Sequence, residues 1–520
     1  MQRRAFLQTS AATLPLALSN VPVGVPRSPL FEALTADPSD RVLVLIQLNG
    51  GNDGLNSFVP LDAYDDLAAV RGNILPRQSD LLHVESRLAF HPKLAGFRDV
   101  WESGRMAAVQ NVGYPDQNRS HFRSTDIWNT ASPADEVYDT GWLGRHFDRV
   151  YPGFPAGFPN REARDPAAIT VGNGVTETCQ GLAGNFAITV KDPLNQGSIL
   201  EVDGGEEAGG IYGDELAFVR TAISQSNAYG QVIREAAERG DSVADYPDDV
   251  FGRQLSYVAR MISGGLRTKV YVVTLGGFDT HASQVIPGDP TAGEHAERLR
   301  RLGEGVAAFQ DDLRALGISD RVIGMTYSEF GRRIRSNAAY GTDHGTAAPA
   351  FLFGDCIAAG TTGDNPEVDR AVDEQEGVAM QYDFRDLYGT VLEDWFGLDD
   401  RTIRGLLHEE YARLPGVIAC SARPDGPTST TDPDDGATGL SASPTAFREA
   451  VRLTFTTTQA GRVRLSAFDV AGRLVETLFS RRLPPATQTV TVDTREYPHG
   501  VVVFRLQQGS RVRTVRTIRR

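Results

Sequence analysis

Residues 269–281, KVYVVTLGGFDTH, join an apolar run to two glycines, an acid and a histidine. Residues 270–273 are all apolar, which is typical of a strand buried on both faces of a parallel sheet. The two glycines predict a turn directly after this strand. Ligands of open α/β sheets bind outside the carboxyl ends of the strands, so Asp279 and His281 are candidate site residues.

Similar apolar runs recur along the chain and alternate with helical stretches. Strands are expected at residues 42–48, 106–113 and 321–327. Helical patterns cover residues 91–104 and 295–317. This alternation predicts an α/β fold, a doubly wound and mainly parallel sheet with helices on both faces.

Length and charge limit the classes of function. The 520 residues are 41% hydrophobic, enough for one large domain and a smaller one. The net charge is −15, but residues 441–520 hold 14 Arg and 5 acids, so the first 440 residues carry −24. Such an acidic body argues against nucleic acid as a partner. The widely spaced Cys179, Cys356 and Cys420 predict no disulfide framework.

Both ends of the chain carry signals for export. The opening MQRRAFLQTSAATLPLALSN has Arg3 and Arg4 before an apolar run too short to cross a bilayer. It predicts a twin-arginine signal and leader over residues 1–40, the twin-arginine translocase as a partner, and no transmembrane span.

The composition of residues 417–440, rich in Pro, Ser, Thr and Asp, predicts a linker. Closely spaced strand candidates over residues 441–520 then predict a small antiparallel β-sandwich.

Three acids lie at or near predicted strand ends, and two of them bring a histidine. They are Asp53 in NGGNDG, Asp279 and His281 in GGFDTH, and Asp343 and His344 in GTDHGTA. If they converge, each pair of carboxylates 4 Å apart repels by about 4 kcal/mol at an effective dielectric of 20. A divalent cation relieves that repulsion, and the donor types suit zinc, manganese or calcium as one or two ions.

Other candidates surround these acids. Ser120 in NRSHF stands at an expected helix start, either as a nucleophile activated by a metal or as a helix cap. His121 is either a further ligand or a donor to the substrate. In SEFGRR, Glu329 is a candidate ligand or supporting residue, and Arg332 or Arg333 suits an anionic oxygen.

The motifs GGNDGLN, NRSHF, GWLGRHFD, GGFDTH, SEFGRR and TDHG resemble, in this order, a bacterial exported family known as domain of unknown function 1501. The resemblance covers residues 40–415. That family is placed in the alkaline phosphatase superfamily with the sulfatases. The resemblance implies an alkaline phosphatase-like α/β domain over residues 41–416, with a metal site at the carboxyl ends of the strands.

The resemblance also implies roles for single residues. Asp53 matches the first acidic ligand, Ser120 lies in the region of the nucleophile, and the remaining ligands match Asp279, His281, Asp343 and His344. The spacing of Asp279 and His281 is closer than usual, and neither His408 nor His499 offers a clear late ligand. The formylglycine sulfatase pattern is absent at Cys420 and Ser120.

Residues 441–520 resemble the type A sorting domain of the type IX secretion system through AFDVAGRLVETLF and the basic finish. This implies that type IX machinery carries the protein from the periplasm to the cell surface or medium; an adhesion or carbohydrate-binding sandwich is the alternative. Together these features predict a secreted metal-dependent hydrolase of phosphate or sulfate esters, with an anionic ester as substrate. The alternative is a non-catalytic surface protein on the same scaffold.

Overall fold

The computed structural model describes residues 40–161, 163–195, 211–420, 438–443, 446–447, 450–457, 461–469, 474–495, 497, 500–508 and 511–519. The chain divides into two compact units, Met1–Pro424 and Asp425–Arg520. The predicted export signal, apart from Asp40, and most of the predicted linker lie outside the described residues.

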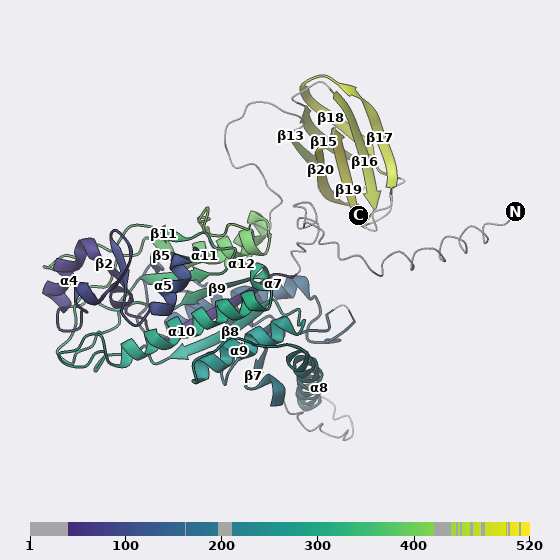
Figure 1. Cartoon of the computed structure of the whole chain (residues 1–520). Coiled ribbons are helices and arrows are strands. Elements are labelled where there is room, and N and C mark those ends of the chain that lie inside the picture. The colour runs from purple at the N-terminus through teal and green to yellow at the C-terminus, as the bar shows by residue number, and fades with distance from the viewer. Residues whose placement is uncertain are drawn as a thin grey trace, which may run out of the picture. The chain divides into compact units, whose positions relative to one another are not determined.

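A nine-stranded sheet forms the centre of the first unit (Figure 1). Its order is β11-β5-β10-β9-β1-β8-β6-β7, and β12 pairs with β5. The bounds are β1 Val42–Asn49, β5 Met106–Gly113, β6 Ala168–Val171, β7 Ala187–Val190, β8 Val270–Gly276, β9 Val322–Tyr327, β10 Ala348–Phe353, β11 Gly360–Thr362 and β12 Tyr382–Asp383. β1 pairs in parallel with both β8 and β9. The predicted mixed α/β fold with a mainly parallel sheet is therefore confirmed.

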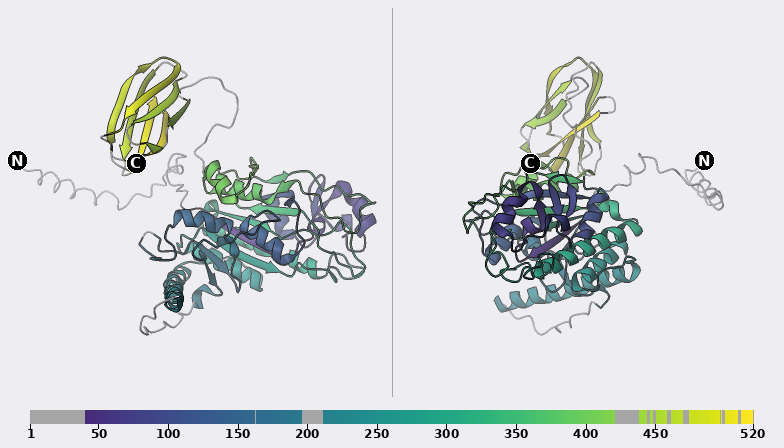
Figure 2. Two further views of the ribbon diagram at one scale, coloured as in Figure 1. Left: turned by 180° about the vertical axis from the view of Figure 1, so that it is seen from behind. Right: turned by 60° about the vertical axis from the view of Figure 1, so that its left-hand side comes forward.

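Helices cover both faces of this sheet because its central strands are apolar on both sides (Figure 2). Val44 and Ile46 of β1 belong to one core, which includes residues of α5 Ala95–Glu102, α8 Ile211–Arg239, α9 Val250–Ser263 and α10 Glu294–Ala315. Leu43 and Leu45 belong to the other core, with residues of α6 His121–Thr130, α7 Trp142–Val150, α11 Phe384–Thr390 and α12 Asp400–Leu407.

One strand of the sheet runs against the others and thereby shapes the site. β10 lies between β9 and β5 and is antiparallel to both. The chain leaves β9 at Tyr327 and enters β10 at Ala348. Since neighbouring antiparallel strands are joined at one edge of a sheet, residues 328–347 stay at the carboxyl edge of the parallel strands.

The expectation that the cysteines form no disulfide is wrong. Cys356 and Cys420 are bonded, with their Cα atoms 5.0 Å apart. The sequence did not indicate this pairing, because the two cysteines are 64 residues apart in the chain. The structure brings the two segments together through a β-bridge between Ile357 and Ile418, while Cys179 is free and buried.

A small sheet of β2 Phe58–Pro60, β4 Leu88–Phe90 and β3 Leu82–Glu85 lies beside the helices α3 Gly54–Ser57 and α4 Tyr64–Arg71 in the first unit. The second unit contains two further sheets, β13-β15-β18 and β14-β20-β19-β16-β17. Their bounds are β13 Thr438–Ser443, β14 Ala446–Phe447, β15 Ala450–Thr457, β16 Gly461–Asp469, β17 Leu474–Leu483, β18 Ala486–Asp493, β19 Gly500–Gln508 and β20 Arg511–Arg519. Most strand pairs are antiparallel, and Phe455, Leu465 and Phe504 share one core.

These sheets are consistent with the predicted sandwich, and its sorting role stays a prediction. Among the described residues, no helix is long and apolar enough to cross a membrane.

Candidate metal centre

The turn after β8 places Asp279 at the carboxyl edge of the sheet. Gly277 has a φ of +94°, which reverses the chain, and the buried Phe278 anchors the turn in the core. The loop after β1 approaches so closely that a Cβ on Gly50 would lie 2.3 Å from the backbone nitrogen of Asp279. The side chain of Asp279 is 46% exposed.

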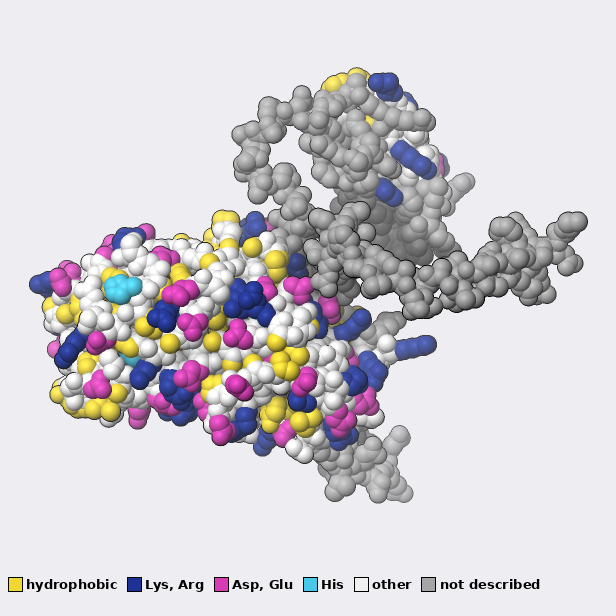
Figure 3. All heavy atoms as spheres, in the orientation of Figure 1, with side chains coloured by type: hydrophobic (Ala, Val, Ile, Leu, Met, Phe, Trp, Pro, Cys, Tyr) yellow, Lys and Arg dark blue, Asp and Glu magenta, His cyan; other side chains and the backbone are white. Residues whose placement is uncertain are grey.

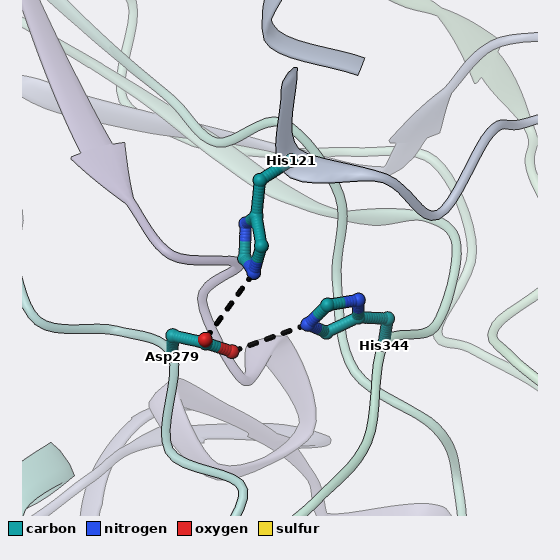
Figure 4. Close-up of side chains that lie close together, drawn as sticks. All are labelled: His121, Asp279 and His344. Atoms are coloured by element: carbon teal, nitrogen blue, oxygen red, sulfur yellow. Dashed lines mark hydrogen bonds and ion pairs between the residues drawn. The ribbon is translucent and has the colours of Figure 1, made fainter. Parts of the chain in front are cut away.

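Three histidines surround this carboxylate (Figure 4, which shows two of them). His121, the first residue of α6, places Nε2 3.3 Å from Oδ2 of Asp279. The Nε2 atoms of His281 and His344 each lie 3.1 Å from Oδ1. Ligand atoms of His121, Asp279 and His344 all lie within 4.8 Å of one another.

The remote ring nitrogen of each histidine is also bonded. Nδ1 of His121 lies 2.8 Å from the buried carboxylate of Glu329, and Nδ1 of His281 lies 2.7 Å from Asp343. His344 directs Nδ1 at the carbonyl oxygen of Arg119, at 2.8 Å. Carboxylate and carbonyl partners of this kind orient the histidines of metal sites, because they fix the ring and leave Nε2 free.

The hydrogen bonds determine which nitrogen carries the proton in two of these rings. A carbonyl oxygen only accepts, so His344 donates from Nδ1, and His281 does so toward the carboxylate of Asp343. In the neutral rings both Nε2 atoms are then acceptors, yet they face each other at 2.8 Å. Nε2 of His121 is buried and has no hydrogen-bond partner. A cation bound among these nitrogens satisfies the lone pairs of His281 and His344 and gives Nε2 of His121 a partner.

The charges of the site favour a cation. Burial opposes the ionisation of Asp279, but the hydrogen bond and the charge of Arg332 outweigh it and hold its pKa at about 2. Burial lowers the pKa of His344, which keeps this ring neutral near pH 7. The hydrogen bond to Glu329 raises the pKa of His121. Three imidazoles and one carboxylate form a donor set suited to zinc or manganese.

Asp53 is not brought into this cluster. Its buried carboxylate accepts hydrogen bonds from Nη1 of Arg71 at 2.8 and 3.0 Å and from Gln284 at 2.6 Å. Burial works against its ionisation, but the charges of Arg71 and His295 and these hydrogen bonds lower its pKa. Asp53 is thus already neutralised by an arginine, which removes the reason to assign it a metal.

Asp343 belongs to the surroundings of the cluster. Besides His281, it contacts Arg333 at 3.3 Å. Burial opposes the ionisation of Asp343, but the hydrogen bond of His281 and the charge of Arg333 lower its pKa. It therefore supports His281. Neither residue belongs to the group formed by His121, Asp279 and His344, but Nε2 of His281 lies 2.8 Å from Nε2 of His344 and 3.1 Å from Oδ1 of Asp279.

The side chain of Arg332 is fully buried, and its guanidinium donates hydrogen bonds to other residues of the protein. It donates to Oδ1 of Asp279 at 2.8 Å and to carbonyl oxygens of three loops, at Gly50, Gly51, Phe278 and Thr342. These bonds hold the loops after β1, β8 and β9 together and leave its guanidinium no free face for a substrate. The expectation that Arg332 holds an anionic substrate oxygen is therefore not supported by its contacts.

Ser120 lies beside the cluster, at the N-terminus of α6. It is exposed and occupies the N-cap position, but its hydroxyl makes no capping hydrogen bond. The next residue, His121, supplies a candidate ligand. The hydroxyl of Ser120 is therefore accessible, although it does not line the adjoining cleft.

A cleft of about 480 Å³ opens beside His121 and Asp279. One wall comes from α6 and includes the 91% exposed ring of Phe122. The remaining lining is polar or small, with Val175 as the other apolar side chain: Asn49, Gly50, Thr125, Asp126, Asn129, Val175, Glu177 and Gly277. This cleft therefore gives solvent access to His121 and Asp279.

The sequence alone did not indicate Arg71 or Gln284, which hold Asp53. Arg71 ends α4 and Gln284 follows the turn after β8, and neither stands in a motif. The i, i+2 spacing after a strand did indicate Asp279 and His281, and both lie in the cluster.

Fold and site together define a mixed α/β protein with a histidine and aspartate cluster at the carboxyl edge of its sheet. Residues 101–414 match a family described as protein of unknown function DUF1501, and the chain belongs to that family. None of the curated proteins matches the chain.

Several solved structures are similar over most of their length at low identity. A sulfatase, PsFucS1, from Pseudoalteromonas sp. is 10% identical, with 90% of this chain and 86% of that chain covered and a TM-score of 0.32. A protein of the alkaline phosphatase superfamily from Vibrio parahaemolyticus is 9% identical, covering 87% and 79%, with a TM-score of 0.32. A putative sulfatase, yidJ, from Bacteroides fragilis is 9% identical, covering 89% and 90%, also at 0.32. Scores this low do not transfer a site to this chain.

Proposed function

We propose that the protein is an exported metal-dependent hydrolase of phosphate or sulfate esters. The observation that carries the proposal is the pair of Nε2 acceptors of His281 and His344, which face each other at 2.8 Å beside Asp279. His121, Asp279, His281 and His344 would hold one divalent ion. Zinc or manganese suits this nitrogen-rich set better than calcium, which prefers oxygen ligands.

A divalent ion at such a site supplies Lewis acidity and lowers the pKa of a bound water or hydroxyl. The residues of the chain prepare for this chemistry. Glu329 and Asp343 orient two of the ligands. The exposed hydroxyl of Ser120, or a water from the cleft, is the proposed nucleophile. The N-terminus of the ten-residue helix α6 favours an anionic ester beside it.

The cleft suits the alcohol part of such an ester better than a second anion. Its lining includes Asp126 and Glu177 and no Lys or Arg. Burial and the charge of Asp126 raise the pKa of Glu177, as expected of two acids that lie close together. A neutral, hydroxyl-rich group would use the amides of Asn49 and Asn129 and pack on Phe122.

The alternative is a non-catalytic surface protein that holds a structural ion. The lining of the cleft favours this alternative, because it gives a substrate anion no arginine or lysine. Both functions require a bound ion, but only the hydrolase cleaves an ester.

Ester hydrolysis by the signal-free protein, loaded with zinc or manganese, separates them. p-Nitrophenyl phosphate, bis-p-nitrophenyl phosphate and p-nitrophenyl sulfate serve as probes. For the hydrolase we expect turnover that His344→Ala lowers at least a hundredfold and that the exposed control His83→Ala retains. Loss of ester hydrolysis in Ser120→Ala would identify the serine as the nucleophile. Retained hydrolysis in this variant would indicate that water is the nucleophile. A metal-loaded parent that cleaves no ester supports the alternative.

Export is proposed from three features of the chain. The disulfide between Cys356 and Cys420 is typical of proteins that mature outside the cytosol. Arg3 and Arg4 would engage the twin-arginine translocase, and the C-terminal unit would engage type IX machinery. Arg3→Lys/Arg4→Lys should keep the protein in the cytosol, as measured by cell fractionation; unchanged export would contradict the first step.

A further inference from the structure

A second cavity of the first unit, of about 420 Å³, is lined by basic side chains. They come from the loop before β6, from the C-terminus of α8 and from the segment before β8, and are Arg161, Arg164, Arg239, Arg267 and Lys269. Asp165 is the acid of its lining. We call this feature the basic cavity.

The basic cavity lies at the amino edge of the sheet, opposite the candidate metal centre. Lys269 directly precedes β8, and Asp279 follows it. At 3.3 Å per residue, the seven-residue strand alone spans about 23 Å. In Figure 3, Lys and Arg side chains project at the right-hand edge of this unit, the edge from which β8 starts in Figure 1.

Within the described part of the chain, most of the arginines of this cavity have no acidic partner. Arg164 pairs with Glu235 at 3.0 Å, and Asp165 accepts a hydrogen bond from the backbone of Arg267. The guanidinium of Arg239 donates to the neutral carbonyl oxygen of Gly264. Among the described residues, the side chains of Arg161, Arg239 and Arg267 form no ion pair. Like charges that share a cavity repel each other until an anion joins them.

Composition does not explain this concentration of charge. The first 440 residues carry a net charge of −24, yet the lining of the basic cavity holds five cations and one acid. Arginine also differs from lysine in chemistry, because its planar guanidinium binds phosphate and sulfate through two parallel hydrogen bonds.

We infer that the basic cavity is a binding site for ligands that carry two or more phosphate or sulfate groups. Arg161 and Arg267 supply unpaired guanidiniums, and Arg239 is held in place by its backbone contact. The same chemistry is found in soluble oligophosphates and in lipid headgroups that carry two phosphates. The cavity would bind such ligands whether or not the metal centre cleaves esters.

The test uses the full chain without its signal, with tripolyphosphate in titration calorimetry and, in sedimentation, vesicles of phosphatidylcholine with cardiolipin, whose headgroup carries two phosphates. Arg161→Glu/Arg267→Glu reverses two exposed, unpaired charges of the cavity. Arg77→Glu/Arg401→Glu makes the same change at two exposed arginines elsewhere and serves as control. Circular dichroism melts verify that both variants fold.

We expect the parent and the control to bind at least one probe, more weakly as salt is added, and the cavity variant to bind at least tenfold more weakly. Binding of tripolyphosphate identifies a soluble ligand, and binding of vesicles alone identifies a lipid headgroup. Failure of the parent to bind either probe would overturn the inference, as would equal losses in the cavity variant and the control.

Discussion

His281 and His344 face each other through their Nε2 atoms at 2.8 Å, while each donates from Nδ1 to an oxygen behind it. Two neutral imidazoles in this arrangement place lone pair against lone pair. A bound cation turns that repulsion into coordination, since both nitrogens then serve as ligands. The arrangement of these two rings therefore favours a bound cation.

Glu329 is expected to strengthen metal binding through its hydrogen bond with His121. Its buried carboxylate accepts from Nδ1 of His121 and from the backbone N–H of Gly50. Glu329→Gln keeps the shape but weakens the bond to the ring, so metal affinity should fall about 10- to 100-fold. Competition with a chelator measures the change. Glu102→Gln, at a side chain 63% exposed on α5, is the control; equal affinities in both variants would contradict this role.

Asp53 and Arg71 are expected to stabilise the fold without binding metal. Arg71→Met leaves a buried carboxylate unpaired, which should cost about 3–5 kcal/mol in the free energy of unfolding. Asp53→Asn/Arg71→Met should recover part of the loss, as measured by urea unfolding. Folded Asp53→Asn should retain the metal content of the parent. Loss of metal from this folded variant would restore Asp53 as a ligand.

Two buried histidines near Asp53 predict a loss of stability in acid. Burial lowers the pKa of His91 to about 3 and that of His295 to about 4. Both values lie below the ordinary value near 6.5, so the unfolded chain binds these protons first. Stability is complete above pH 6.5 and falls as the pH drops toward the folded values, by about 2 kcal/mol per histidine at pH 5.

Urea unfolding of the parent and of His295→Gln at pH 7.5 and pH 5 measures this effect. The variant should lose less stability than the parent between the two pH values, because one of the two titrating rings is gone. An unchanged pH dependence would show that other groups cause the acid sensitivity.

Much of the fold follows from local sequence patterns. The apolar runs at β1, β5, β8 and β9 are long and uninterrupted, and each forms a strand of the central sheet. The direction of β10 was not predictable, because it depends on where the loop after β9 returns to the sheet. The disulfide was missed for the same reason, since 64 residues separate its cysteines.

The site was predictable where ligands follow strands and unpredictable where partners come from elsewhere. Asp279, His281 and His344 stand in short motifs after or between strands, and the structure brings them together. Asp53 in NGGNDG also follows a strand, so the sequence pattern did not distinguish it from these three residues. Its partner Arg71 lies 18 residues further along the chain, and no pattern links the two.

The metal content of the purified protein shows directly whether the histidine cluster binds an ion. Elemental analysis of the folded, signal-free protein should find about one zinc or manganese ion per chain. His281→Ala and His344→Ala should each lose it, whereas the exposed control His83→Ala should retain it. A parent that binds no divalent metal at any ratio, or alanine variants that keep the full metal content, would show that these histidines do not hold an ion.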